Sequence, residues 1–115
     1  MNKSNCFFDV EKEEGDVLRL TLHGEIDHHS AVGVRTEIDS IVYEERPQIL
    51  ILDLSAIEFM DSSGLGLIMG RYALMQRLGG EIRLRNPHER IIKIFELAGL
   101  SRMVQIEEEQ KEDKQ

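Results

Sequence analysis

The chain has 115 residues, 41% hydrophobic and 31% charged, a composition typical of one soluble globular domain. Its formal net charge of −8 argues against a surface that neutralises nucleic-acid phosphates or anionic lipid, so we expect protein partners, no nucleic acid and no membrane. The only cysteine is Cys6, which excludes an intramolecular disulfide and a zinc-binding cysteine cluster and fits the reducing cytoplasm. We expect no signal peptide, because the start turns acidic, and no membrane span, because the apolar runs are short.

The first half of the chain predicts a hairpin followed by a helix. Residues 7–13 and 16–23 read as two strands, because apolar and polar residues alternate in the second and a glycine-containing turn separates the two. Apolar residues then recur every three or four positions from Ala31 to about Glu45, which predicts an amphipathic helix. Asp27 and Ser30 are both plausible N-caps for this helix.

The second half alternates strands and helices. Residues 48–54 are almost all isoleucine and leucine, which is typical of a central strand covered on both faces. We expect a single α/β domain over residues 1–108 with a mixed, mostly parallel sheet, in the order β-β-α-β-α-β-α-β, and a charged tail over 109–115. The remaining elements are a helix from Ser62 or Ser63 to Leu78, a strand over 81–85, a helix over 88–97 and a strand over 103–106.

The segment DSSGLG carries the candidate functional site. It lies where a helix follows a buried strand, the position at which open α/β sheets gather functional groups. The free N–H groups of a helix start favour negative charge, so Ser62 or Ser63 is a good phosphate acceptor beside Asp61. Gly64 and Gly66 leave the first turn bare, so a second protein could approach the backbone closely.

From spacing alone, a purely structural interpretation stays open, in which Asp61 or Ser62 is only a cap and the glycines only allow close packing. The segment has neither the lysine of a phosphate-binding loop nor the GxSxG pattern of a nucleophile elbow. Asp27 and Asp61 have no histidine or third carboxylate at ligand spacing, so we predict no catalytic residue, no metal site and no enzyme. His28 is expected to face solvent or a partner, and Arg71 to contact an acidic partner or to be solvated.

Two blocks, GEIDHHSA and FMDSSGLGLIMGRY, resemble the sulfate transporter and anti-sigma factor antagonist domain, the STAS family. The resemblance spans about residues 7–106 and is nearest to the antagonists that act in sporulation. The family pattern implies a regulatory protein without a cofactor of its own. Its partner would be an anti-sigma factor that is also a serine kinase, and a serine phosphatase would reverse the reaction.

The same resemblance implies that the unphosphorylated chain binds the kinase and releases the sigma factor, and that phosphorylation ends this binding. The family's phosphorylated serine falls on Ser62, with Ser63 as the alternative. An antagonist for a stress-response sigma factor and a stand-alone ligand- or nucleotide-binding module stay open as alternatives. The expected partner-contacting residues are Asp27, His28, Asp61, Ser62, Ser63, Gly64, Gly66 and Arg71.

Overall fold

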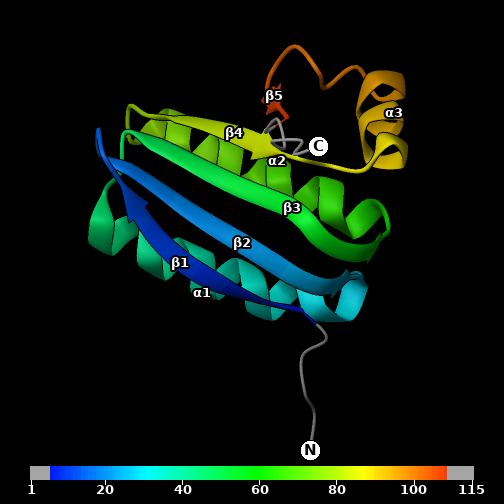
Figure 1. Cartoon of the computed structure of the whole chain (residues 1–115), viewed down its shortest axis with the longest axis horizontal. Helices are drawn as coiled ribbons and strands as arrows, with labels where there is room; N and C mark the ends of the chain where they lie inside the picture. Colours follow the sequence, from blue (N-terminus) through cyan, green and yellow to red (C-terminus); the bar gives the residue numbers. More distant parts are fainter. Residues whose placement is uncertain (1–5, 109–115) are drawn as a thin grey trace, which may run out of the picture.

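The computed structural model describes residues 6–108, which form five strands and three helices (Figure 1). Their order along the chain is the predicted one, so the α/β fold class is confirmed. The predicted tail over 109–115 lies outside the described residues. The elements are β1 (Cys6–Glu13), β2 (Val17–Ile26), α1 (His28–Glu45), β3 (Ile49–Met60), α2 (Ser62–Arg77), β4 (Glu81–Arg85), α3 (Glu89–Leu97) and β5 (Gln105–Glu107).

The five strands form one sheet in the order β1-β2-β3-β4-β5. The β1–β2 hairpin is antiparallel, and every later neighbour pairs in parallel, as a strand–helix–strand connection requires. The carboxyl ends of β2 and β3 therefore lie at the same edge of the sheet, with Ile26 opposite Met60.

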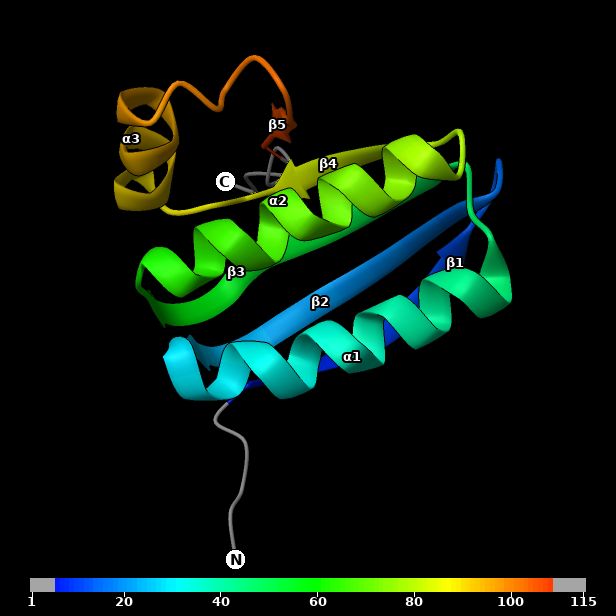
Figure 2. The same cartoon turned by 180° about the vertical axis from the view of Figure 1, so that it is seen from behind.

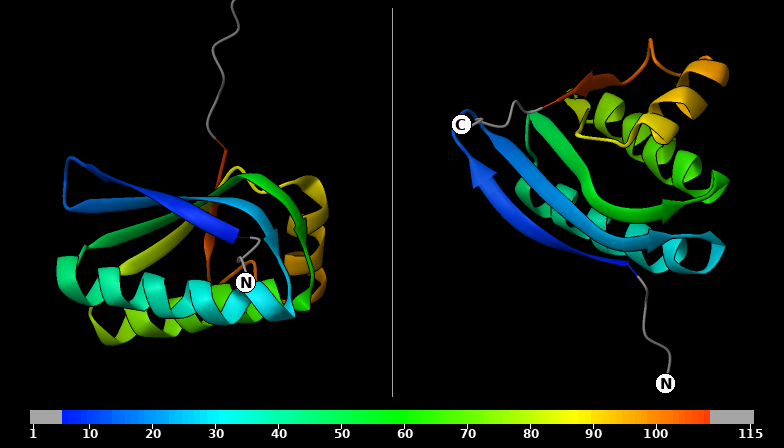
Figure 3. Two further views of the ribbon diagram at one scale, coloured as in Figure 1. Left: turned by 90° about the horizontal axis from the view of Figure 1, so that it is seen from below. Right: turned by 45° about the vertical axis from the view of Figure 1, so that its right-hand side comes forward.

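Helices α1 and α2 lie side by side on one face of the sheet, as Figures 2 and 3 show. Leucines at alternate positions of β2 and β3 point towards these helices, and isoleucine and valine of α1 meet them at helical spacing. This layer is the core of the domain. Its fully buried members include Leu18, Leu20, Leu22, Val34, Ile38, Val42, Leu50, Leu52 and Leu54.

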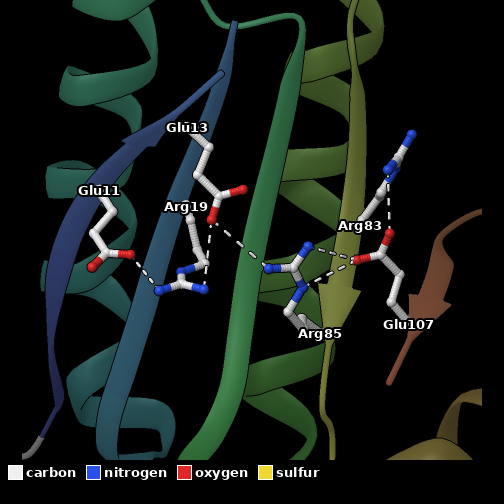
Figure 4. A network of polar contacts seen from close by, with 6 residues as sticks. All are labelled: Glu11, Glu13, Arg19, Arg83, Arg85 and Glu107. Atoms are coloured by element: carbon white, nitrogen blue, oxygen red, sulfur yellow. Dashed lines mark hydrogen bonds and ion pairs between the residues drawn. The ribbon is translucent and has the colours of Figure 1, made fainter. Parts of the chain in front are cut away.

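The opposite face of the sheet is covered by charged side chains instead of a helix. Arg19 pairs with Glu11 and Glu13, and Arg83 and Arg85 pair with Glu107 (Figure 4). Between these arginines in the strand register lies Ile51, which is only 2% exposed. The prediction that β3 is covered on both faces is therefore confirmed, with long charged side chains covering the second face.

Two strands run further than the sequence predicted. β2 continues past residue 23 to Ile26, and β3 continues past residue 54 to Met60, where a loop was expected. The register shifts twice in this stretch, and Gly24 has a positive φ of 96°, a conformation that glycine adopts freely. These irregularities interrupt the apolar alternation without ending the pairing, and the two strands reach the site together.

Among the helices of residues 6–108, none is both long and apolar enough to cross a membrane.

Candidate functional site at two helix N-termini

The site is built from two strand–helix junctions that lie next to each other. β2 ends at Ile26 and β3 at Met60, and each is followed at once by an aspartate that caps the next helix. The backbone N–H of Asp61 donates a hydrogen bond to the carbonyl of Ile26, with an N–O distance of 3.1 Å. The two blocks that the sequence analysis singled out are thus joined directly at the sheet edge.

Asp27 is the N-cap of α1, so the first of the two predicted caps is correct. Its Oδ1 accepts hydrogen bonds from the backbone N–H of His29 and of Ser30, at 2.9 and 2.8 Å. Ser30 completes a capping box, because its hydroxyl oxygen accepts from the N–H of Asp27 at 3.0 Å. The hydrogen bond from the Ser30 N–H is the largest cause that lowers the pKa of Asp27, so this carboxylate is ionised and held in place.

Asp61 is the N-cap of α2, and the helix begins at Ser62, as one of the two predicted starts. Its Oδ1 accepts from the backbone N–H of Ser63 at 2.7 Å, and its carbonyl accepts from the N–H of Gly64 at 2.9 Å. Ser62 is exposed and Ser63 is half-buried. Of the two serines, Ser62 is therefore the more accessible from solvent.

The two glycines of the motif have different surroundings. A Cβ on Gly64 would lie 2.2 Å from Cγ of Met60, so this buried glycine makes room for the side chain that crosses the first turn of α2. A Cβ on Gly66 would meet nothing within 4 Å, and this glycine is exposed. The packing interpretation thus accounts for Gly64 but leaves Gly66 unexplained by the fold.

Arg71 lies elsewhere than expected. It is 6% exposed, and its Nε lies 2.9 Å from Oδ1 of Asp39 on α1. Its Nη1 donates to the carbonyl of Leu67 at 3.3 Å. The alternative of a solvated arginine is therefore wrong, and a guanidinium enclosed between two helices offers almost no surface to a partner.

The histidine beside the first cap is free to meet another molecule. His28 and His29 are both exposed, at the first turn of α1. Within residues 6–108, no three histidine, cysteine, aspartate or glutamate side chains lie close enough together to hold a metal ion. The groups that this edge offers are the two carboxylates that cap the helices, from Asp27 and Asp61, and the exposed residue Ser62.

Two apolar side chains near the site were not singled out from the sequence. Phe59 is 49% exposed near the carboxyl end of β3, and Val32 is 54% exposed on α1. Phe59 was missed because a loop was expected where β3 continues. Its pairing with Glu25 brings it to the same edge as Asp27 and Ser62.

The fold and this edge define a small α/β domain with its candidate functional groups at helix N-termini. A comparison with protein families matches the STAS domain over residues 8–112, so the chain belongs to the STAS family. This confirms the resemblance found in the sequence.

The chain is similar to regulators of two kinds. It is 34% identical to an anti-sigma F factor antagonist of Paenibacillus polymyxa, over 89% of this chain and 86% of the relative. It is 32% identical to an anti-sigma-B factor antagonist of Bacillus subtilis (strain 168), over 89% of this chain and 91% of the relative. Among solved structures, it resembles the anti-sigma factor antagonist SpoIIAA in its unphosphorylated form, with a TM-score of 0.76 and 28% identity over 91% of this chain and 90% of that one.

Proposed function

We propose that this protein is an anti-sigma factor antagonist that is switched off by phosphorylation of Ser62. In the unphosphorylated form it binds an anti-sigma factor that is also a serine kinase, and the sigma factor is released. The kinase phosphorylates Ser62 and dissociates, and a serine phosphatase restores the binding form. The observation that carries the proposal is the exposed Ser62 at the first residue of α2. It lies at the sheet edge where the carboxylates of Asp27 and Asp61 cap the two helices.

A phosphate at this position has opposite effects on the domain and on a docked partner. It adds about −1.5 to −2 charges at neutral pH. The N-terminus of α2 attracts that charge while Asp61 repels it, so the fold should change little. A partner seated on Ser62 would have to accommodate the bulk and desolvate the charge, which is costly.

The comparisons support a switch that acts at the surface. SpoIIAA has been solved in a phosphorylated form as well, and this chain resembles that form with a TM-score of 0.72 over 91% of its length. The similarity to both forms is close to equal. A phosphate on Ser62 would therefore leave the domain folded and alter only what it binds.

We infer a role in sporulation, through an anti-sigma F factor. Two anti-sigma F factor antagonists, from Paenibacillus polymyxa and Lysinibacillus sphaericus, are 34% and 32% identical to this chain. The anti-sigma-B antagonist of Bacillus subtilis is 32% identical, so a stress-response sigma factor is the second candidate. Kinases from the two systems, each tested for binding to this chain, would separate the two.

The proposed docking surface consists of the exposed and half-buried groups around Ser62. It has Asp27 and His28 on one helix start and Asp61, Ser62 and Gly66 on the other. Ser63 and Gly64 shape the turn beneath it, and Phe59 supplies an exposed apolar side chain at its margin. Arg71 is left out because it is buried.

Substitution of Ser62 tests the proposal. We expect Ser62→Ala to bind the anti-sigma kinase in the presence of ATP and to stay unmodified, and Ser62→Asp to bind weakly. Pull-down with and without ATP gives the binding, and mass spectrometry of the incubated protein locates the phosphate.

Ser63→Ala is the matched control, since it removes the neighbouring hydroxyl from the same helix turn. It should bind the kinase and still gain one phosphate. The proposal fails if Ser62→Asp binds as tightly as the unsubstituted protein, or if the phosphate is found on Ser63.

A further inference from the structure

The ion pair between Asp39 and Arg71 joins the two helices that carry the site. Arg71 lies on α2 and Asp39 on α1, with Nε–Oδ1 and Nη2–Oδ2 distances of 2.9 and 3.4 Å. Both carboxylate oxygens therefore lie within ion-pair distance of the guanidinium, but only the Nη2–Oδ2 contact has the geometry of a hydrogen bond, whereas Nε and Oδ1 face each other without one. The arginine side chain is 7% exposed and the aspartate 31%, so the pair is mostly shielded from water.

Burying such an ion pair between two helices carries a large desolvation cost. Burial lowers the pKa of Arg71, and the charge of Asp39 opposes that effect while Arg35 adds to it. A well-packed apolar pair at the same place would often be as stable or more stable. Stability alone therefore does not account for a buried arginine here.

The ion pair can oppose sliding of one helix along the other, which apolar contacts do poorly. Helices packed through aliphatic side chains can slide past each other by small amounts. A guanidinium that holds both oxygens of a carboxylate within ion-pair distance resists sliding, because displacement along the axis lengthens at least one of these two contacts in a site shielded from water. Nη1 of Arg71 also donates to the carbonyl of Leu67, one turn earlier on its own helix, which holds the side chain in position.

The position of the pair relates it to the site. Arg71 lies nine residues after Ser62, about 13 Å along the axis of α2. At the tip, the N–H of Asp61, the cap of α2, donates to the carbonyl of Ile26, the last residue of β2 before the cap of α1. The two strand–helix units are thus connected at two levels: a backbone hydrogen bond joins the residues that lead into the helices, and an ion pair joins α1 and α2 deeper along their length.

We propose that the Asp39–Arg71 pair is a clamp that fixes the axial register of α1 and α2, and with it the placement of Asp27 relative to Ser62 that a kinase must match. Arg71 is then a positioning residue for docking and phosphorylation. The inference rests on the proposed function, but it also predicts a property of the protein alone, namely the strength of the Asp61–Ile26 hydrogen bond.

A double substitution, Asp39→Leu with Arg71→Met, separates a clamp from a stabilising contact. Removing both charges together leaves no unpaired ion, so we expect a free energy of unfolding equal to or above that of the unsubstituted protein. We expect exchange of the Asp61 amide hydrogen, measured by NMR, to become about tenfold faster while amides of central β3 are unchanged. The affinity for the anti-sigma kinase should fall about fivefold or more, and the rate of Ser62 phosphorylation should fall with it.

Lys12→Met with Glu45→Leu is the matched control, because this ion pair of 2.8 Å also joins two elements but lies at the far end of α1. It should change neither Asp61 exchange nor kinase affinity. Arg71→Lys keeps the charge but not the two ion-pair contacts of the guanidinium and should show the same faster exchange, in case the double variant folds poorly.

Unchanged Asp61 exchange together with unchanged kinase affinity in a stable double variant would overturn the clamp. If the unsubstituted protein itself bound no anti-sigma kinase, the proposed function would fall instead, and the exchange measurement would still decide whether the pair fixes the register.

Discussion

At the scale of single residues, Gly64 and Gly66 belong to one motif but have different surroundings and different predicted roles. Gly64 is buried beneath Met60, so its missing side chain is a requirement of the fold. Gly66 is exposed with open space around it, and glycine in a helix costs about 1 kcal/mol relative to alanine. Gly33 and Gly70 also have open space around them within helices, so what sets Gly66 apart is its place one turn from Ser62, and we predict that a partner docks against it.

We expect Gly66→Ala to raise the free energy of unfolding by about 0.5–1 kcal/mol, because alanine favours the helix and meets no neighbour. The same methyl group should weaken binding to the anti-sigma kinase, since Gly66 lies one turn from Ser62. Denaturant unfolding and a binding titration measure the two effects. A more stable variant with unchanged affinity would remove Gly66 from the docking surface.

Gly64→Ala is the counterpart with the opposite effect on stability. Its Cβ would lie 2.2 Å from Cγ and 2.5 Å from Sδ of Met60, so that side chain must move. We expect the free energy of unfolding to fall by about 1–3 kcal/mol, the usual cost of inserting a methyl group into a filled space. Gly64→Ala with Met60→Ala should recover part of this loss, and no recovery would show that the strain lies in the backbone.

At the scale of elements, the starts of α1 and α2 are similar but not equivalent. Asp27 is part of a complete capping box with Ser30, whereas Asp61 caps α2 through the N–H of Ser63. The start of α2 is therefore the more dependent on a single side chain. It is also the one that carries the exposed serine.

We expect Asp61→Ala to lower the free energy of unfolding by about 0.5–2 kcal/mol through loss of the cap. Asp61→Ser keeps an oxygen that can accept from the N–H of Ser63 but removes the charge, so its stability should stay close to that of the unsubstituted protein. Thermal unfolding of the pair gives the cap energy, and kinase binding by Asp61→Ser gives the contribution of the charge. Equal destabilisation by both substitutions would show that the carboxylate charge, and not the cap, supports α2.

The elements were predictable where local patterns are strong. β4 has the bounds expected from its alternation, and α2 begins at Ser62, one of the two predicted starts, because aspartate, serine and glycine mark a helix start. The extension of β3 to Met60 was not predictable, since it depends on pairing with β2 across a bulge. The burial of Arg71 was likewise not predictable from the local sequence, because its ion-pair partner, Asp39, lies 32 residues earlier in the chain.

At the scale of the whole molecule, the two faces of the sheet are protected in different ways. One face packs against α1 and α2, and the other is covered by a network of ion pairs from four strands (Figure 4). The edge at the ends of β2 and β3 carries the exposed Ser62, and it is here that we propose the partner docks. Cys6, at the start of β1, is buried in the core between the sheet and helices α1 and α2.

The stability of the molecule should therefore depend on pH in the alkaline range. Burial, with a smaller contribution from the charges of Glu37 and Asp27, raises the pKa of the Cys6 thiol from 9.0 to about 11. Between these values the unfolded chain loses the thiol proton and the folded chain keeps it. Raising the pH through this window therefore lowers the free energy of unfolding, since the folded state binds more protons.

We expect the free energy of unfolding to fall more steeply above about pH 9 in the unsubstituted protein than in Cys6→Ala. The alanine variant loses packing as well, but that loss is a constant offset that leaves the slope unaffected. Denaturant unfolding at a series of pH values from 7 to about 10.5 measures both curves, with other titrating groups common to the two proteins. Parallel curves would mean that the Cys6 thiol has the same pKa in the folded and unfolded chain, and therefore that water reaches it in the folded protein.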